Sequence, residues 1–338
     1  MRARVWMKGK GSCVLTVSLL LMGLLFWPAQ SASANNTTFS GRATVVDATV
    51  LGIQTVISDT GPLPPSGGAQ DATLLSASVP GLLAAEVLHA STVGQGQRSS
   101  SEASVANVTL TVGGNTITAG LLQARATAEC HNGVASVSGS SDIVDLVVNG
   151  QAIVVSGAPN QTIALPIGSI IINEQRSANA GDLTVNALHV VIDGVANVII
   201  SSAHADITCG GPVCPGGDFV TGGGWITGTP SGAKGNFGVA GGIKNGGLWG
   251  HLTYIDHGPG GPKVKGTGVT AYAVVDSVTR HIEGSAEING QGGFTYEVDV
   301  ADNGEPGRND TFSLSLSNRY HASGLLVGGN IQLHKPCK

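Results

Sequence analysis

Residues 209–217 read Cys-Gly-Gly-Pro-Val-Cys-Pro-Gly-Gly, and this segment limits the fold more than any other part of the chain. Because proline lacks a backbone N–H and glycine is costly to order, neither a helix nor a strand is expected to run through it. The aromatic content also changes here: residues 40–214 contain no Phe, Trp or Tyr, and ten occur after residue 215. We therefore expect two domains, 39–209 and 218–338, joined by a linker at 210–217.

The first 34 residues have the features of a signal peptide. Four basic residues within the first ten precede an apolar run at 14–27, and Ala32-Ser33-Ala34 supplies the small residues that a signal peptidase needs. Fourteen helical residues span about 21 Å, less than the roughly 30 Å hydrocarbon core of a membrane. We expect cleavage after Ala34, a secreted protein and no membrane span in the mature chain. An uncleaved anchor is the alternative.

The mature chain is expected to be acidic. Residues 1–34 hold four of the 17 Lys and Arg residues and none of the 22 Asp and Glu residues, so the mature balance is 13 − 22 = −9. A nucleic-acid-binding protein needs a concentrated basic surface, which this sequence lacks. The partner we expect is an extracellular protein or a glycan.

Four cysteines remain after cleavage: Cys130, Cys209, Cys214 and Cys337. An even number in an exported chain favours disulfides. We prefer Cys130–Cys209, which end two similar segments, and Cys214–Cys337, which would tie the first strand of the second domain to its last. The alternative is a small Cys209–Cys214 loop with Cys130–Cys337 between the domains. A zinc site is a further interpretation, although the spacing is loose and a second ligand pair is missing nearby.

Strand patterns dominate residues 39–209. Residues 44–50 and 105–112 are β-branched and alternating, and Gly113-Gly114, Asn149-Gly150 and Asp193-Gly194 each separate two apolar runs, as in tight hairpins. We expect an antiparallel, sandwich-like β domain with a core of Val, Ile, Leu and Ala. Residues 80–89 are the one helix candidate, with a loop-borne turn as the alternative.

The second domain is expected to be a small antiparallel barrel or sandwich. Short apolar segments recur at regular intervals, which is typical of a meander, and in-strand glycines suit bent strands or close backbone approach. The eight expected strands are 218–227, 235–243, 247–256, 264–275, 279–289, 293–301, 311–317 and 324–334.

Two parts of the chain resemble bacterial families. The run from Phe39-Ser40-Gly41 through residues 183–189 to Cys209 resembles the choice-of-anchor P family. Residues 217–226, 250–257, 302–307 and 328–333 resemble the post-COAP domain. The resemblance implies a secreted or surface module of a bacterium and brings no assigned activity with it.

Aromatic residues of the second domain are the candidates for ligand binding. Trp225, Trp249 and Tyr254 would serve a carbohydrate-binding or adhesive protein, because exposed rings form platforms for sugars. Core positions are the alternative for these rings, since that domain has few other large side chains.

A calcium site is the one metal hypothesis for the second domain. Carboxylates and an amide crowd a turn rich in Gly and Pro, and oxygen ligands are what Ca²⁺ prefers. The candidate ligands are Asp299, Asp302, Asn303, Glu305 and Asp310. A turn held by Asp and Asn side-chain bonds is the alternative, and we expect no other cofactor.

The histidines give no catalytic pattern. His89, His131, His189 and His204 are far apart in sequence and are expected at the surface or in hydrogen bonds. His251 and His257 would face the same way on a strand but lie about 20 Å apart, too far to share a metal. We assign no catalytic residue and expect a secreted structural or interaction module without enzymatic activity. A carbohydrate-binding protein and a secreted hydrolase are the two alternatives.

Overall fold

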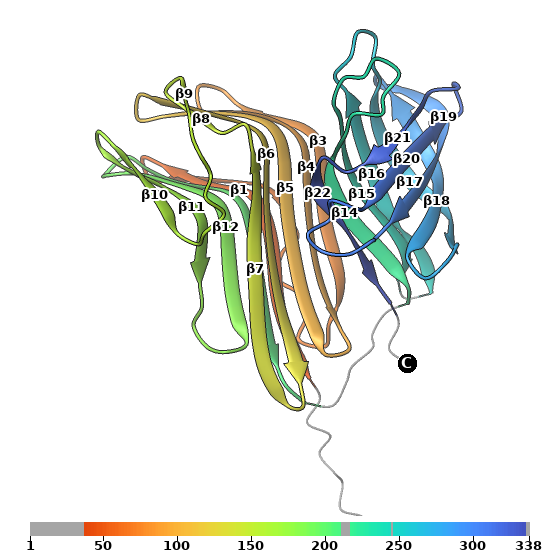
Figure 1. Ribbon diagram of the computed structural model, residues 1–338, viewed down its shortest axis with the longest axis horizontal. Helices are drawn as coiled ribbons and strands as arrows, with labels where there is room; N and C mark the ends of the chain where they lie inside the picture. Colours follow the sequence, from red (N-terminus) through yellow and green to blue (C-terminus); the bar gives the residue numbers. More distant parts are fainter. Residues whose placement is uncertain (1–36, 211–216, 245, 336–338) are drawn as a thin grey trace, which may run out of the picture. The chain divides into compact units, whose positions relative to one another are not determined.

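The computed structural model describes residues 37–210, 217–244 and 246–335, all within one compact unit, Ala34–Lys338 (Figure 1). Every regular element in these ranges is a strand, and the strands pair antiparallel, so the predicted all-β class is confirmed. Over the same ranges the structure contains no helix with the length and hydropathy needed to cross a membrane. The predicted signal peptide, Cys214, Cys337 and most of the predicted linker lie outside the described residues.

The first part of the chain is a sandwich of two sheets (Figure 1). The six-stranded sheet has the order β10 (Gln161–Leu165), β11 (Gly168–Arg176), β12 (Asp182–Ile192), β13 (Ala196–Thr208), β1 (Thr38–Val50) and β2 (Ile53–Asp59). The seven-stranded sheet has the order β3 (Gly68–Val79), β4 (Leu83–Gln95), β5 (Arg98–Val112), β6 (Asn115–His131), β8 (Val147–Val148) and β9 (Gln151–Ala152), with β7 (Val134–Val144) also paired to β6.

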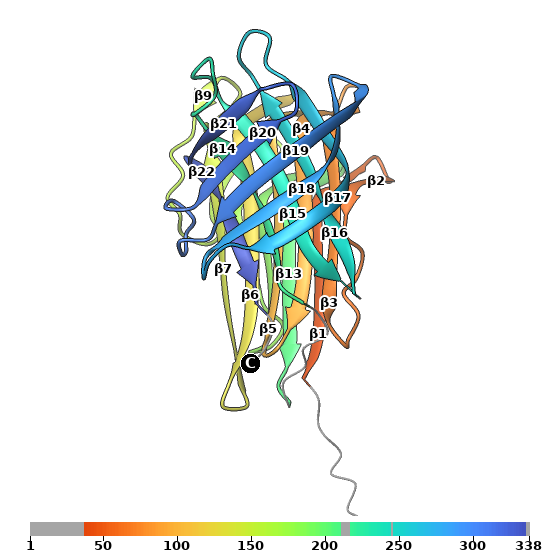
Figure 2. The same cartoon turned by 90° about the vertical axis from the view of Figure 1, so that its right-hand side faces the viewer.

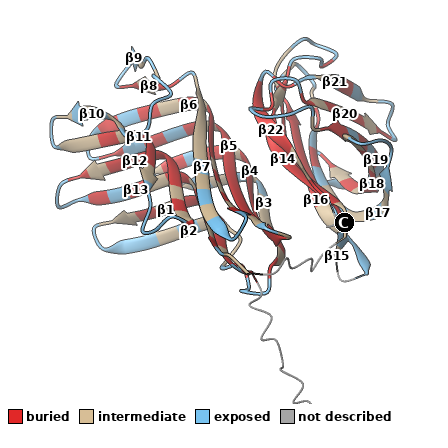
Figure 3. Cartoon of the chain, turned by 60° about the horizontal axis from the view of Figure 1, so that its bottom comes forward, coloured by how far each residue is buried: buried red, intermediate tan, exposed pale blue. Residues whose placement is uncertain are grey.

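Small aliphatic side chains fill the space between these two sheets. Apart from Phe39 and Cys130, the buried members of this core are Val, Ile, Leu and Ala, as the composition predicts. Polar side chains also cross the gap, since Ser201 Oγ of β13 donates to the Leu122 carbonyl of β6 at 2.9 Å. Figure 3 shows buried residues on both sheets. The alternation of buried and exposed positions therefore sets which face of each strand points inward.

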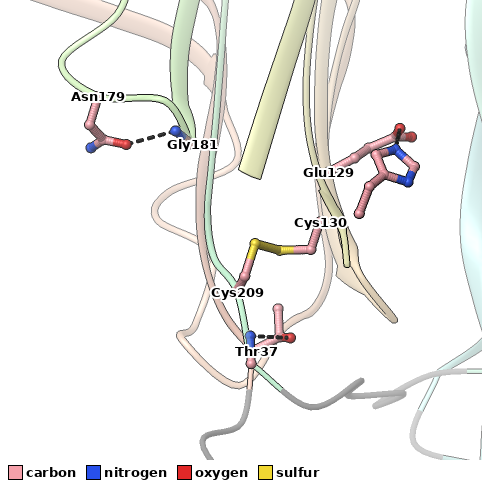
Figure 4. Close-up of a disulfide and its surroundings, with 8 residues drawn as sticks. Thr37, Glu129, Cys130, Asn179, Gly181 and Cys209 are labelled. Carbon is pink, nitrogen blue, oxygen red and sulfur yellow. Dashed lines mark hydrogen bonds and ion pairs between the residues drawn. A yellow bond between two sulfur atoms is a disulfide. The ribbon is translucent and has the colours of Figure 1, made fainter. Parts of the chain in front are cut away.

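The Cys130–Cys209 disulfide joins the end of β6 to the residue after β13, and therefore the two sheets (Figure 4). Its Cα atoms lie 5.6 Å apart, within the usual range, and Cys130 is 3% exposed. The predicted pairing is confirmed. The alternative, which assigned Cys209 to Cys214, is wrong.

The hairpin predictions are also confirmed. Asn149 and Gly150 both adopt positive φ, at 50° and 80°, and connect β8 to β9. The helix prediction is wrong, because residues 83–89 lie in β4 between β3 and β5. Neighbours on both sides satisfy the backbone of β4, and this outweighs the helical spacing of Leu83, Val87 and Leu88.

The second part of the chain is a single nine-stranded sheet (Figure 2). Its order is β21 (His321–Leu325), β20 (Thr311–Leu316), β19 (Gln291–Ala301), β18 (Thr279–Ile288), β17 (Lys263–Val274), β16 (Gly247–Asp256), β15 (Gly235–Lys244), β14 (Phe219–Ile226) and β22 (Gly328–His334).

This sheet curls around its own core. Phe237 of β15 and Phe312 of β20 stack at a centroid distance of 4.0 Å, although four strands lie between β15 and β20 in the sheet. The expected segment 324–334 is two strands rather than one, because the chain leaves β21 and crosses over. The resulting last strand, β22, pairs with the first, β14, so backbone hydrogen bonds join the two ends of this part of the chain.

Side-chain contacts also connect the seven-stranded sheet with the nine-stranded sheet. Gln123 Nε2 donates to the Gly223 carbonyl at 3.4 Å, and a Cβ built on Gly223 would lie 2.5 Å from Ser104 Oγ. Small apolar clusters such as Ala69, Val93 and Phe219 span the same junction. Glycine in β14 therefore allows close approach of the neighbouring strand, one of the two roles that the sequence predicts for in-strand glycines.

Candidate functional site

Three hollows follow one another where strands β3 to β7 meet the nine-stranded sheet. We call them the arginine hollow, of about 270 Å³, the middle hollow, of about 380 Å³, and the tryptophan hollow, of about 240 Å³. The arginine and middle hollows share Arg98 and Ser100, and the middle and tryptophan hollows share Gln95. Shared lining residues make the three hollows neighbours in a row.

The arginine hollow is built on the register of β5 and β6. Residues Arg98, Ser100 and Glu102 alternate along β5, and alternate residues of a strand share one face. Their ladder partners on β6 are Glu129, Thr127 and Arg125. Two antiparallel strands therefore place two guanidinium groups and two carboxyl groups on the same face.

Hydrogen bonds to neutral side chains hold the guanidinium group of Arg125 in place. Its Nη1 donates to Gln123 Oε1 at 3.1 Å, and its Nε and Nη2 each donate to Ser140 Oγ at 3.3 Å. Within the described ranges, no carboxylate lies within ion-pair distance of this guanidinium. Arg98 differs, because its Nε lies 3.4 Å from Glu129 Oε1.

Glu102 is a buried carboxyl group at the base of the arginine hollow. Its residue is 5% exposed, and burial raises its pKa to about 8, although Arg125 opposes the shift. At neutral pH this group is therefore protonated and able to donate a hydrogen bond. Its Oε1 atom has no hydrogen-bond partner in the structure, although it is shielded from solvent.

The opposite wall of the arginine hollow comes from the second part of the chain. Glu305, Pro306 and Gln332 line it. Asn330 Nδ2 donates to Glu305 Oε1 at 3.2 Å and so positions this exposed carboxylate at the rim. The hollow therefore combines segments that are about 200 residues apart in the sequence.

The tryptophan hollow has an aromatic wall. Trp249 of β16 lies edge-on to Phe219 of β14, with centroids 5.9 Å apart, and both rings line the hollow. Lys244 Nζ lies 5.4 Å from the centre of the Trp249 ring and donates to the Ala69 carbonyl. Trp249 is only half-buried, so part of its ring faces the hollow. A flat ring beside an ammonium group and backbone polar groups is suited to a polyhydroxylated ligand.

The middle hollow continues this aromatic row. His334 lines it and stacks on Phe219 with centroids 4.6 Å apart. Burial lowers the pKa of His334 to about 3, so the ring is neutral at physiological pH. Asp302 and Lys335 line the same hollow, and Asp302 Oδ2 accepts the Leu333 N–H at 2.9 Å.

Of the three aromatic residues predicted to bind ligand, Trp249 is the one that lines a described hollow. Tyr254 is fully buried in the core of the nine-stranded sheet and donates to the Tyr320 hydroxyl at 2.7 Å. Trp225 is half-buried, with Lys234 Nζ 4.5 Å from its ring centre. The alternative interpretation, that these rings pack in the core, is therefore the correct one for Tyr254.

Each predicted calcium ligand takes part in a hydrogen bond within the protein. Asp299 accepts from His281 Nδ1 at 2.8 Å, and Asp310 accepts the Asn303 and Ile331 N–H groups, each at 2.8 Å. Asp302 accepts the N–H of Gly304 at 3.1 Å, and Glu305 points to the arginine hollow. Among the residues that the structure describes, no group of three or more His, Cys, Asp or Glu side chains is placed to hold a metal ion. Asp302 and Asp310 hold the turn through backbone hydrogen bonds, whereas Asp299 and Glu305 accept from side chains.

Two of the histidines form a buried chain with Asp71. His251 Nδ1 donates to Asp71 Oδ2 at 2.7 Å, and His89 Nδ1 and His251 Nε2 share a hydrogen bond of 3.1 Å. Burial lowers the pKa of His89 to about 3, so this ring stays neutral. His251 of β16 and His257, which follows the end of β16, both contact the first part of the chain, while Tyr254 of β16 points to the core.

Sequence reasoning missed the charged residues of the arginine hollow. The available signal was the alternation of charge and hydroxyl groups in residues 98–102 and 123–129. In an otherwise aliphatic sandwich such a polar face requires a partner surface or a ligand.

No protein family and no curated protein matches this sequence. Among solved structures, the crystal structure of kievitone hydratase from Nectria haematococca is similar over 87% of this chain and 88% of that chain, with 10% identity and a TM-score of 0.20. A similarity of this size supports no conclusion about fold or function. The fold and the site together define an all-β protein that carries a row of polar and aromatic hollows.

Proposed function

We propose that this protein is a non-catalytic interaction module that works outside the cell and binds carbohydrate. The observation that carries the proposal is the position of Trp249, a half-buried ring that lines the tryptophan hollow next to Lys244. Sugars pack their C–H faces on such rings, and neighbouring polar groups pair with their hydroxyls. The hydroxyl-rich lining of the arginine hollow gives further support.

Binding to a glycan array tests the proposal. Trp249→Leu keeps apolar bulk against Phe219 and removes the flat ring, so we expect loss of glycan binding with little change in melting temperature. Trp225→Leu is the matched control, because this ring lines none of the three hollows and its loss should leave binding unchanged. Equal binding by both variants, or no glycan bound by the wild type, would contradict the proposal.

The extracellular location has its own support and its own test. The apolar run at 14–27 and the Ala-Ser-Ala sequence at 32–34 favour export with cleavage after Ala34. Mass spectrometry of the protein from a bacterial culture supernatant should give a chain that begins at Asn35. A full-length chain in the cell pellet would contradict export.

A further inference from the structure

The three hollows differ in chemistry but share residues, and this continuity indicates one binding surface. Between them, the lining residues come from β3, β4, β5, β6 and β7 in spatial order. Adjacent strands of a sheet lie about 4.8 Å apart, so four steps across five strands cover about 19 Å. A row of this length is suited to a chain of several sugar units rather than to a single one.

The opposite wall is equally continuous. Trp249, Phe219 and His334 form a row of ring contacts that leads from the tryptophan hollow into the middle hollow. Residues 332–335 continue along β22 into the arginine hollow, where Gln332 is part of the lining. Both walls therefore run in the same direction along the row.

The charge of the row is opposite to that of the whole chain. Four basic side chains line the three hollows, Lys244, Lys335, Arg98 and Arg125. Against them stand the carboxylates of Asp302 and Glu305 in the lining and of Glu129, which pairs with Arg98, together with the carboxyl group of Glu102. In a chain with a formal net charge of −5, this local excess of positive charge points to an anionic ligand.

The strongest anion-binding element is Arg125. Neutral acceptors fix its guanidinium, and within the described ranges no carboxylate neutralises it. A guanidinium presents a planar set of donors that matches a carboxylate or a sulfate ester. Next to it, the hydroxyls of Ser100 and Thr127 line the hollow and are available for the hydroxyl groups of a sugar.

We propose that the three hollows form one groove that binds a linear acidic glycan, with an anionic group of the glycan against Arg125 and Arg98 and a sugar ring on Trp249. The inference rests on the proposed carbohydrate binding and names the ligand class. The anionic group is a uronate carboxylate or a sulfate ester, since both match the guanidinium.

Titration calorimetry with matched hexasaccharides tests the groove. The probes are an α-1,4-linked galacturonate hexamer, the same hexamer as its methyl ester, a sulfated galactan hexamer and its unsulfated form. We expect one or both acidic probes to bind at least about tenfold more tightly than their neutral partners, because charge-assisted hydrogen bonds are the stronger ones. The pair with the larger ratio identifies the anionic group. Added salt should reduce this preference.

Variants locate the anionic group. Arg125→Gln should remove most of the preference for the acidic probe and lower the affinity for the neutral probe much less. Arg125→Lys keeps the charge and should retain an intermediate preference. Arg319→Gln, on the exposed turn between β20 and β21, is the matched control and should behave as the wild type.

The outcomes separate the two proposals. If acidic and neutral probes bind equally and Trp249→Leu abolishes both, carbohydrate binding stands and the acidic-glycan groove is wrong. If acidic probes are preferred but Arg125→Gln keeps the full preference, the anionic group lies elsewhere and the inference is also wrong. If no probe binds, the inference fails whatever the result of the glycan array.

Discussion

The imidazole of His251 lies 2.7 Å from the carboxylate of Asp71, although 180 residues separate them in the chain. This contact joins β16 of the nine-stranded sheet to β3 of the seven-stranded sheet. Both side chains are largely buried, with 9% and 19% of their surfaces exposed. A buried hydrogen bond to a charged group is expensive to break, because each partner then loses both water and protein contacts.

Asp71→Ala should therefore destabilise the protein. We expect a loss of about 1–3 kcal/mol in the free energy of unfolding, measured by urea denaturation. Asp299→Ala is the matched control, because it removes a similar contact to His281 at 2.8 Å on an exposed face. A loss of less than about 1 kcal/mol is expected there. Equal losses in the two variants would contradict the role of burial.

The buried carboxyl group of Glu102 predicts a pH dependence of stability. Burial raises its pKa in the folded protein from 4.5 to about 8, so above pH 4.5 the unfolded chain releases a proton that the folded chain retains. This contribution to stability is complete below pH 4.5 and is lost as the pH rises to about 8, by up to about 1.4 kcal/mol per pH unit.

Glu102→Gln isolates that effect. The amide does not titrate, so the stability of the variant relative to the wild type should rise steadily between about pH 5 and about pH 8. Urea denaturation of both proteins at each pH gives the difference, and other titrating groups cancel. A constant difference over this interval would show that Glu102 is ionised in the folded protein.

The Cys130–Cys209 disulfide should contribute substantially to stability. It closes a sequence separation of 79 residues, for which the chain-entropy relation gives about 4–5 kcal/mol. The Cys130→Ser/Cys209→Ser double variant should lose about this amount in urea denaturation. Its remaining sensitivity to a reducing agent tests the predicted Cys214–Cys337 pair. An unchanged midpoint in the variant would contradict the role of the first disulfide.

The close approach of Ser104 to Gly223 predicts that a larger side chain at residue 223 destabilises the protein. Because an added Cβ would meet Ser104 Oγ at 2.5 Å, Gly223→Ala should cost about 1–3 kcal/mol. Removing the hydroxyl in a Gly223→Ala/Ser104→Ala double variant should recover part of the loss. Gly292→Ala on β19 is the control, since nothing lies within 4 Å of its Cβ and φ is not positive. If Gly223→Ala is as stable as this control, the two strands are not in tight contact.

Short sequence patterns predicted those parts of the fold that depend only on neighbouring residues in the chain. Asn149-Gly150 marks a hairpin because its two residues adopt the positive φ that the turn needs. Segment 80–89 was ambiguous because three apolar residues at helical spacing also fit a strand buried on both faces. Its conformation depends on its neighbours β3 and β5, which a local pattern does not contain.

The candidate site was less predictable for the same reason. Trp249 was a candidate because exposed rings form platforms for sugars, and the same criterion also selected Trp225 and the buried Tyr254. Arg125 was not, because its importance depends on two structural facts: no carboxylate of the described residues lies within ion-pair distance of it, and the register places Glu102 opposite it. Both conditions result from the pairing of distant segments. The buried contact of His89 with His251 has the same origin.

The pairing of β14 with β22 has a consequence for biosynthesis. Gly222 of β14 is aligned with Ile331 of β22. The ribosome therefore releases β22 more than one hundred residues after β14. Until then, one edge of β14 stays open, and an open strand edge invites pairing with other chains. Truncated products that stop before residue 328 should therefore aggregate more than the complete chain.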